Sequence, residues 1–325
     1  MITDMHRHFV PPRFLDFVCR RAEFQVTIKR REGDLVDADI RGRHFGLNTA
    51  FFDLERHLQQ MDREGIERAV LSLATPFIDY GHDGVLAIET AQLYNDALAE
   101  AIAAAPDRCR AWAFLPMQDA ESAAIELRRC VTEHGFLGGH IASNVRGVYL
   151  HDPQFAPLFR EAIDLGVPLF VHPADPAGKE RMREYELTVV AGYLFDSTIN
   201  ILSLVCSGFL DRWPTLKLIC AHTGAFSLSL RARMQREVDT NPIIAGNLRR
   251  PVGEYLRQLY FDSICFEPRM LQYALEVVPA EHILLGSDAP FPLGEADPVG
   301  FVRRALPSAQ AEDILGGNLK RLLGK

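Results

Sequence analysis

The sequence predicts an α/β protein, a (β/α)8 TIM barrel, because short apolar runs alternate with longer stretches of helical periodicity. Eight runs have the length of buried parallel strands, namely Met1–Met5, Ala69–Ala74, Ala111–Leu115, Leu137–Ala142, Pro168–Val171, Leu216–Ala221, Leu259–Phe261 and Ile283–Leu285. The helical stretches between them include Phe52–Glu64, Val85–Ala105, Ala120–His134, Asp152–Leu165 and Thr198–Phe209. Because a count of strands does not establish that a sheet closes, a doubly wound sheet remains an alternative.

One segment interrupts this alternation. Phe24–Ile28 and Leu35–Ile40 each have the pattern of a strand, and the polar residues 29–34 between them have the pattern of a turn. We therefore expect a small β-hairpin insertion, within residues 20–48, after the first strand. In a barrel this insertion would lie near the carboxyl ends of the strands, where active sites are built. The whole chain, residues 1–325, is expected to form one domain that ends in a helix from Ser308.

Composition excludes several classes of protein. The 325 residues carry a formal net charge of −8 and no basic run, which argues against nucleic acid as the partner. No window approaches 18 uncharged apolar residues and the N-terminus has no apolar core of a signal peptide, so we expect neither a membrane span nor a signal peptide. The scattered cysteines do not resemble a disulfide scaffold, so we expect a reducing compartment and a cytoplasmic protein. The six cysteines lie far apart without a CxxC pair, which excludes the usual thiolate zinc sites.

Polar side chains stand where several of the predicted strands end. They are His6 and His8 at the first run, His172 at the fifth, His222 at the sixth and Asp288 after the eighth. Residues two apart in a strand point to the same face, so His6 and His8 can share a metal ion while Arg7 faces away. Imidazole and carboxylate are ligands of zinc, manganese and iron. Each feature alone is weak, but their joint placement predicts a metal site.

The remaining histidines lack this joint placement. His57 lies in a helical stretch and is expected to be solvated. His140 lies in the fourth predicted strand, where it either lines the pocket or belongs to the core.

Four motifs carry a resemblance to a known family: MHRHFVPP at 5–12, LFVHPADP at 169–176, LICAHTGAF at 218–226 and LLGSDAPFPLG at 284–294. They resemble the amidohydrolase superfamily, and within it the branch of the aminocarboxymuconate semialdehyde decarboxylases and related aromatic-acid decarboxylases. Members of that branch are (β/α)8 barrels, usually with a small β insertion after the first strand, and dimers are usual among them. The resemblance therefore implies the same fold and a homodimer.

The resemblance also implies a role for each residue at the strand ends. His6, His8, His172 and Asp288 would hold one divalent ion, with zinc expected and manganese as the alternative. His222 would act together with Asp288 as the catalytic acid and base. No lysine ends the fourth strand, which argues against a two-metal site bridged by a carbamylated lysine.

Arginines hold substrate carboxylates in this branch. Arg233 matches one of them, and Arg43 matches another after a shift of two residues, because Phe45 occupies the aligned place. Phe291 is the expected apolar side chain of the substrate pocket. The branch's pocket tryptophan is replaced by an aliphatic residue near Val189, which changes what the pocket can recognise.

Together these implications predict a nonoxidative decarboxylase of an aromatic or unsaturated carboxylic acid, a small-molecule carboxylate. Metal-bound water and the His222–Asp288 pair would move the protons. The same groups could also attack a lactone or amide carbonyl, or hydrate an activated double bond. A metal-dependent hydrolase and a hydratase of the same superfamily therefore remain alternatives.

Overall fold

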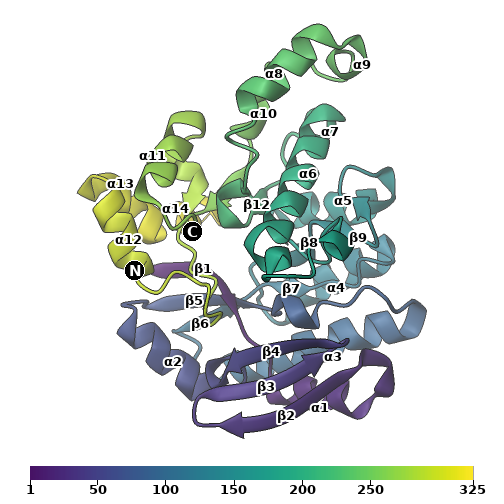
Figure 1. The fold of residues 1–325 in the computed structure, drawn as a ribbon, viewed down its shortest axis with the longest axis vertical. Coiled ribbons are helices and arrows are strands. Elements are labelled where there is room, and N and C mark those ends of the chain that lie inside the picture. Colours follow the sequence, from purple (N-terminus) through teal and green to yellow (C-terminus); the bar gives the residue numbers. More distant parts are fainter. Residues whose placement is uncertain (325) are drawn as a thin grey trace.

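The computed structural model describes residues 1–324, apart from the side chains of residues 30–32. At its centre lie parallel strands that pair in the order in which they occur along the chain (Figure 1). These strands are β1 (Thr3–His8), β5 (Arg68–Ser72), β6 (Cys109–Ala111), β7 (Ala113–Phe114), β8 (Gly139–Ala142), β11 (Leu169–His172), β12 (Leu218–Cys220), β13 (Tyr260–Asp262) and β14 (Ile283–Leu284). Each of the eight apolar runs overlaps a strand, and the third run overlaps both β6 and β7.

The strands form two sheets, β1-β5-β6 and β7-β8-β11-β12-β13-β14. Trp112 alone separates β6 from β7, and its backbone N–H still donates to the Leu71 carbonyl at 2.9 Å. At the other edge, Met5 N–H donates to the Leu285 carbonyl at 2.9 Å, and Asp288 N–H donates to the His6 carbonyl at 2.9 Å. The first strand therefore contacts the segment that follows the last strand.

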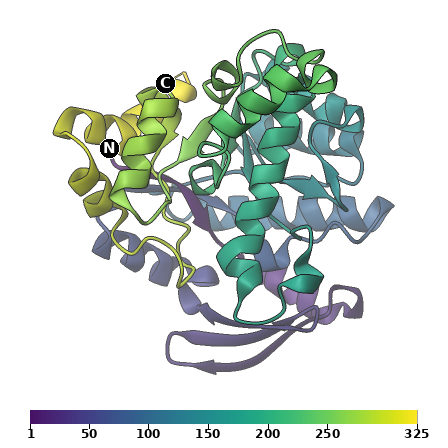
Figure 2. The same cartoon turned by 45° about the horizontal axis from the view of Figure 1, so that its top comes forward.

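Helices lie outside the strands, and both termini lie on the same side of the molecule (Figures 1 and 2). They are α1 (Pro12–Arg20), α2 (Leu54–Arg63), α3 (Gly84–Ile102), α4 (Ala120–Glu133), α5 (Ala156–Leu165), α6 (Tyr193–Cys206), α7 (Phe209–Arg212), α8 (Arg231–Thr240), α9 (Pro242–Ala245), α10 (Val252–Leu256), α11 (Pro268–Val277), α12 (Pro298–Ala305), α13 (Ser308–Glu312) and α14 (Asn318–Leu322). Side-chain caps explain some boundaries: Asp53 accepts the Arg56 N–H at 3.1 Å and so starts α2. The predicted C-terminal helix is interrupted at Gly316, whose backbone lies against the Met1 carbonyl with no space for a side chain.

The insertion differs from the predicted hairpin. It is a three-stranded antiparallel sheet of β2 (Val26–Glu32), β3 (Leu35–Ile40) and β4 (Arg43–Asn48), which lies below the main body in Figure 1. The sequence did not indicate β4 because Leu47 is its only buried side chain and it contains Gly46. Pairing with β3, rather than its own pattern, makes this segment a strand. A second small antiparallel pair joins β9 (Asn144–Val145) to β10 (Val148–Tyr149).

A separate buried cluster lies among the strands. Its members are apolar residues that lie in or next to the central strands, together with two residues of α14. They are Met5, Val70, Trp112, Leu137, Phe170, Ile219, Ala221, Leu284, Leu319 and Leu322. The indole N–H of Trp112 donates to the Met5 carbonyl at 2.8 Å, so its polar edge is satisfied inside this cluster. Such a layer of inward side chains is what the interior of a strand barrel requires.

Charged groups are buried on the other side of β1. Arg7 is fully buried and donates to Asp4 at 3.2 Å, to Glu64 at 2.5 Å and to His57 Nε2 at 3.2 Å. Burial raises the pKa of Asp4 to about 6, although Arg7 opposes this shift. The expectation that His57 is solvated is therefore wrong. It is a buried member of this network.

One segment, Thr188–Cys206, is long and apolar enough to cross a membrane by length and composition, with a mean hydropathy of 1.6. It comprises a π-helical turn at Thr188–Gly192 and helix α6. In this structure 44% of its most apolar window is buried. It also carries Asp196, whose buried carboxylate accepts hydrogen bonds from Ser143, Asn144 and Tyr149.

The Arg7 network yields a stability prediction. We expect Glu64→Gln to lower the free energy of unfolding by about 3 kcal/mol, because it leaves the buried guanidinium only partly compensated. Urea denaturation of the purified protein measures the difference.

The matched control is Glu100→Gln, which removes an exposed partner of Arg13 and should cost less than about 1 kcal/mol. Equal effects of the two substitutions would show that the buried network adds nothing to stability.

Candidate metal centre

The first strand supplies two imidazoles to one point. β1 places His6 and His8 on the same face, and both side chains are fully buried. Their Nε2 atoms lie 3.2 Å apart. Arg7, between them, points into the network on the opposite side, as the alternation of a strand predicts.

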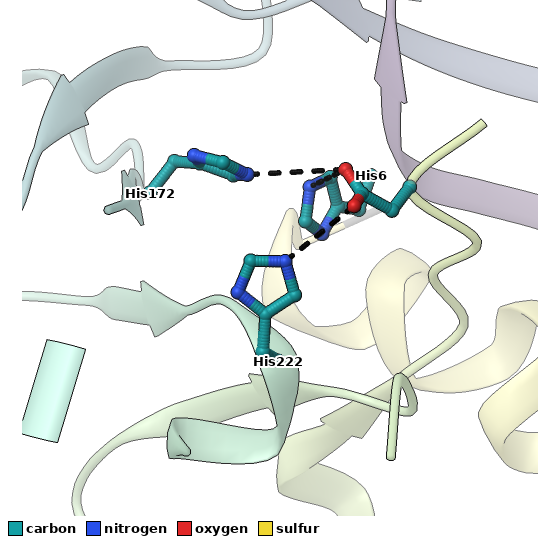
Figure 3. Close-up of side chains that lie close together, drawn as sticks. His6, His172 and His222 are labelled. Atoms are coloured by element: carbon teal, nitrogen blue, oxygen red, sulfur yellow. Dashed lines mark ion pairs between the residues drawn. The ribbon is translucent and has the colours of Figure 1, made fainter. Parts of the chain in front are cut away.

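The segment after β14 brings a carboxylate to the same point. Oδ1 of Asp288 lies 3.2 Å from Nε2 of His6, 2.9 Å from Nε2 of His8 and 3.9 Å from Nε2 of His172. Ligand atoms about 2.0–2.2 Å from one ion lie roughly 3.0–3.6 Å apart, so the separations from His6 and His8 are close to those of a shared metal site, and His172 lies slightly farther away. Figure 3 shows His6, His172 and His222 pointing toward one another from different elements.

The hydrogen bonds of the three imidazoles fit a metal ion. Nδ1 of His6 bonds the Asp262 carboxylate at 2.7 Å, Nδ1 of His8 bonds the Leu73 carbonyl at 3.2 Å, and Nδ1 of His172 bonds the Pro173 carbonyl at 2.9 Å. Carbonyl and carboxylate oxygens only accept, so each Nδ1 carries a proton, and in the neutral ring each Nε2 is the nitrogen that can bind a metal ion. Nε2 of His172 is buried without a hydrogen-bond partner. The converging lone pairs need a cation, and the donor set suits a divalent metal.

The charge distribution favours a cation at the same point. Burial disfavours the charged form of His6, but hydrogen bonds to Asp262 and Asp288 raise its pKa to about 9. Burial would raise the pKa of Asp288, but the surrounding histidines hold it well below its usual range. Asp288 is therefore an anionic carboxylate among imidazoles.

His222 approaches the other oxygen of the carboxylate. Its Nε2 lies 3.7 Å from Oδ2 of Asp288, whereas His6 and His8 contact Oδ1. By distance alone His222 is also a candidate ligand, since one atom each of His6, His172, His222 and Asp288 lie within 4.8 Å of one another. Unlike the buried His6 and His8, His222 lines the adjoining cavity.

Asp262, to which the sequence analysis assigned no role, bonds both the ring of His6 and the backbone of His222. Asp262, at the end of β13, is fully buried, and its Oδ2 bonds Nδ1 of His6 and accepts the His222 N–H at 2.8 Å. Its Oδ1 accepts the Thr223 N–H at 2.8 Å and the Ile264 N–H at 3.0 Å. Its position at the carboxyl end of a predicted strand was the signal that could have identified it.

Asp262 also stabilises an unfavourable backbone. His222 and Thr223 have φ values of 55° and 50°, in the left-handed region that non-glycine residues rarely adopt. Two of the four hydrogen bonds to Asp262 come from the N–H groups of these residues. Local strain of this kind persists where surrounding bonds enforce it, and it is common at active sites.

His140 lies in β8 next to this cluster, fully buried, and stacks on Phe170 with ring centroids 5.3 Å apart. Its ring centroid is 5.9 Å from that of His172. Neither ring nitrogen has a hydrogen-bond partner, and burial lowers its pKa well below the usual value. Since it does not line the cavity, the structure places it in the core.

A cavity of about 540 Å³ opens in front of the cluster. Its floor contains His172, His222 and Asp288, and the expected pocket residue Phe291 lies in its wall. The ring centroid of Phe291 is 5.2 Å from that of His8.

The two expected substrate arginines do not line this cavity. Arg43 is exposed on β4, where it pairs with Glu186 at 4.0 Å and borders a neighbouring hollow. Arg233 is exposed on α8. Phe45 instead occupies the wall beside Arg43.

A family model described as amidohydrolase matches residues 3–325. The chain belongs to the amidohydrolase family. The family resemblance of the four motifs is therefore confirmed.

Relatives of this amidohydrolase include decarboxylases. A 2-amino-3-carboxymuconate-6-semialdehyde decarboxylase of Dictyostelium discoideum is 31% identical over 290 residues, which cover 88% of this chain and 80% of that protein. A gamma-resorcylate decarboxylase of Polaromonas sp. (strain JS666) is 31% identical over 293 residues, which cover 85% of this chain and 89% of that protein.

A solved structure shares the α/β fold of TIM-barrel type. It is a dihydroxybenzoic acid decarboxylase from Polaromonas sp. JS666 with bound manganese and the inhibitor 2-nitroresorcinol. The two chains have a TM-score of 0.80 and 26% identity, over 99% of this chain and 96% of that one.

The position of Asp262 yields a prediction for this amidohydrolase. Asp262→Asn should weaken binding of zinc or manganese by about 10- to 100-fold, because an amide orients His6 poorly and cannot accept all four bonds. Competition with a chromogenic chelator measures the affinity.

Asp239→Asn, which changes an exposed carboxylate on α8, is the control and should bind metal like the parent. Unchanged affinity in Asp262→Asn would show that Asp262 does not support the metal ligands.

Proposed function

We propose that this amidohydrolase is a metal-dependent nonoxidative decarboxylase of an aromatic or unsaturated carboxylic acid. The observation that carries the proposal is the convergence of three imidazoles on Oδ1 of Asp288 at the floor of a cavity, with His222 beside them on the Oδ2 side of the carboxylate. Relatives with decarboxylase names over most of the chain favour this reaction over hydrolysis or hydration.

In this proposal His6, His8, His172 and Asp288 hold one divalent ion. When bound, such an ion supplies positive charge that polarises substrate oxygens and stabilises negative charge during the reaction. Zinc and manganese both suit three imidazoles and one carboxylate, and we expect zinc. The hydrogen bonds on each Nδ1 fix the ring orientations before the ion arrives.

His222 is the proposed proton donor. It lines the cavity, it is not among the residues that surround Oδ1 of Asp288, and Asp262 fixes its backbone. Protonated His222 would add its proton to the carbon that bears the carboxylate. The bond between that carbon and the carboxylate then breaks, its electron pair restores the unsaturated system, and carbon dioxide leaves. Asp288 Oδ2 lies 3.7 Å from Nε2 of His222, on the side of the ring that faces the cluster.

We further propose that the contacts between β1 and the segment after β14 close the strands into an eight-stranded barrel. In this view residues 1–325 form one domain, and the β2-β3-β4 sheet is an insertion within it. We also propose a homodimer in the cytoplasm, as expected for the branch that the motifs resemble.

The first test concerns metal content. Protein loaded with zinc or manganese and then desalted should retain about one ion per chain, because the four proposed ligands form a single set without a bridging lysine. His6→Ala combined with His8→Ala should remove the ion. Elemental analysis that finds two tightly held ions per chain would contradict the mononuclear site.

The second test concerns His222. His222→Asn should retain the metal and lower kcat for carbon dioxide release by roughly 10²- to 10⁴-fold, since a positioned acid contributes about this much. The assay follows carbon dioxide and the decarboxylated product from 2,6-dihydroxybenzoate, and hydrolysis of a lactone or amide is measured in parallel.

His44→Asn is the control, because His44 is an exposed histidine on β4 that does not line the cavity. Loss of the metal in folded His222→Asn would make His222 a ligand. Acid release from a lactone without any carbon dioxide release would favour the hydrolase.

A further inference from the structure

We infer that the substrate is an aromatic monocarboxylic acid with an apolar substituent opposite the reacting carboxylate and no second anionic group. This inference rests on the proposed function and adds to it the chemistry of the part of the substrate that does not react. It follows from an uneven distribution of charge in the cavity.

The histidines and the carboxylate of the cavity lie together at its floor. His172, His222 and Asp288 meet there, at the proposed metal site. Among the described residues that line the cavity, none is a lysine or an arginine. The described lining residues therefore offer one place for a carboxylate, at the proposed metal site, and no second cation in the walls.

The walls are apolar and come from segments far apart in the sequence. The β4 strand contributes Phe45 and Leu47, and α6 with its preceding π turn contributes Val189 and Leu194. Leu228 adds a buried side chain from the segment after β12. A ring inserted toward the metal would be surrounded by these groups.

Lysine and arginine side chains near the cavity lie around a neighbouring hollow, where they form ion pairs with carboxylates. Arg41 pairs with Asp79 at 3.1 Å, and Lys179 pairs with Asp175. Arg43, which borders the same hollow, pairs with Glu186 at 4.0 Å, and its guanidinium carbon lies 5.2 Å from the ring centroid of Phe45. None of these cations lines the main cavity, where a second substrate carboxylate would lie.

The mouth of the cavity is also apolar. Val190, Phe266, Met270 and Leu293 come from three separate segments, line the cavity and are 59%, 52%, 42% and 52% exposed. Single exposed apolar residues are ordinary, but several around one opening indicate a binding surface. An apolar substituent that extends from the ring toward solvent would cover these side chains.

The physical consequence is a strong preference between substituents. Each buried methylene strengthens binding about fourfold, equivalent to about 0.8 kcal/mol. A carboxylate placed against the same walls would lose its hydration without gaining a partner, which weakens binding. The volume of about 540 Å³ falls in the range of roughly 300–1,000 Å³ for sites that hold ligands larger than one small ring.

Three acids that differ only opposite the reacting group test this inference: 2,6-dihydroxybenzoate, its 4-pentyl derivative and its 4-carboxy derivative. For the metal-loaded protein, kcat/KM should be at least about 30-fold higher for the pentyl acid than for the parent acid. It should be at least about tenfold lower for the 4-carboxy acid. Calorimetry should show that 5-pentylresorcinol binds at least about 30-fold more tightly than resorcinol.

A designed variant tests the missing cation. Met270→Arg, at an exposed position on α11 that lines the mouth, should reduce the preference for the pentyl over the 4-carboxy acid by about tenfold. Ile125→Arg makes the same change at an exposed position of α4 away from the cavity, and should leave this preference unchanged.

The outcomes separate this inference from the proposed function. Turnover of the 4-carboxy acid at or above the rate of the pentyl acid would overturn the inference and leave the decarboxylase standing. Equal binding of resorcinol and 5-pentylresorcinol would also overturn it. Tight binding of 5-pentylresorcinol without carbon dioxide release from any acid would support the apolar site and refute the decarboxylase.

Discussion

The site depends on one buried carboxylate. Asp262 has no exposed surface, so each lone pair that lacked a donor would carry the cost of desolvation. Four donors satisfy it, from His6, His222, Thr223 and Ile264. Because one rigid group holds a proposed metal ligand and the proposed acid, their separation is set by the sheet and not by a flexible loop. This arrangement keeps catalytic groups in position without a cost of ordering them when substrate binds.

The strand β1 connects the site to the protein's stability. His6 and His8 point into the cluster, while Arg7 between them joins a buried ionic network with Asp4 and Glu64. The two faces cannot move independently, because a shift of the strand would separate buried charges on one face and the converging imidazoles on the other. Buried ion pairs contribute little net stability, but breaking them is costly. A change in the register of β1 would therefore break this network together with the cluster of imidazoles.

The floor of the cavity contains the proposed reacting groups, and its walls would contact the rest of the substrate. Its floor consists of strand-end residues, whose positions are fixed by the central sheets. Most of its walls come from β4, α6, α11 and the segment after β13, which supply no residue of the floor, whereas the segment after β14 supplies both Asp288 and wall residues such as Phe291. Different walls around the same floor would therefore select different substrates for one reaction. In this chain the described wall residues are mostly apolar and include no lysine or arginine. Arg43 and Arg233, matched to the family by position in the sequence, lie outside the cavity because Phe45 faces it and α8 projects from the body (Figure 1).

The sequence by itself determined the alternation of strands and helices and the residues that converge at the metal site. Both are encoded locally: apolar runs mark the strands, and a period of two puts His6 and His8 on one face and Arg7 on the other. Only the tertiary structure decided that β4 pairs as a third strand, that His57 is buried beside Arg7, and that Asp262 joins His6 to the turn at His222. These features depend on which distant segments meet, and the free energy of burying a charge or pairing a strand edge comes from the partner. Since no local pattern identifies that partner, the ligand types could be predicted and the surroundings that orient them could not.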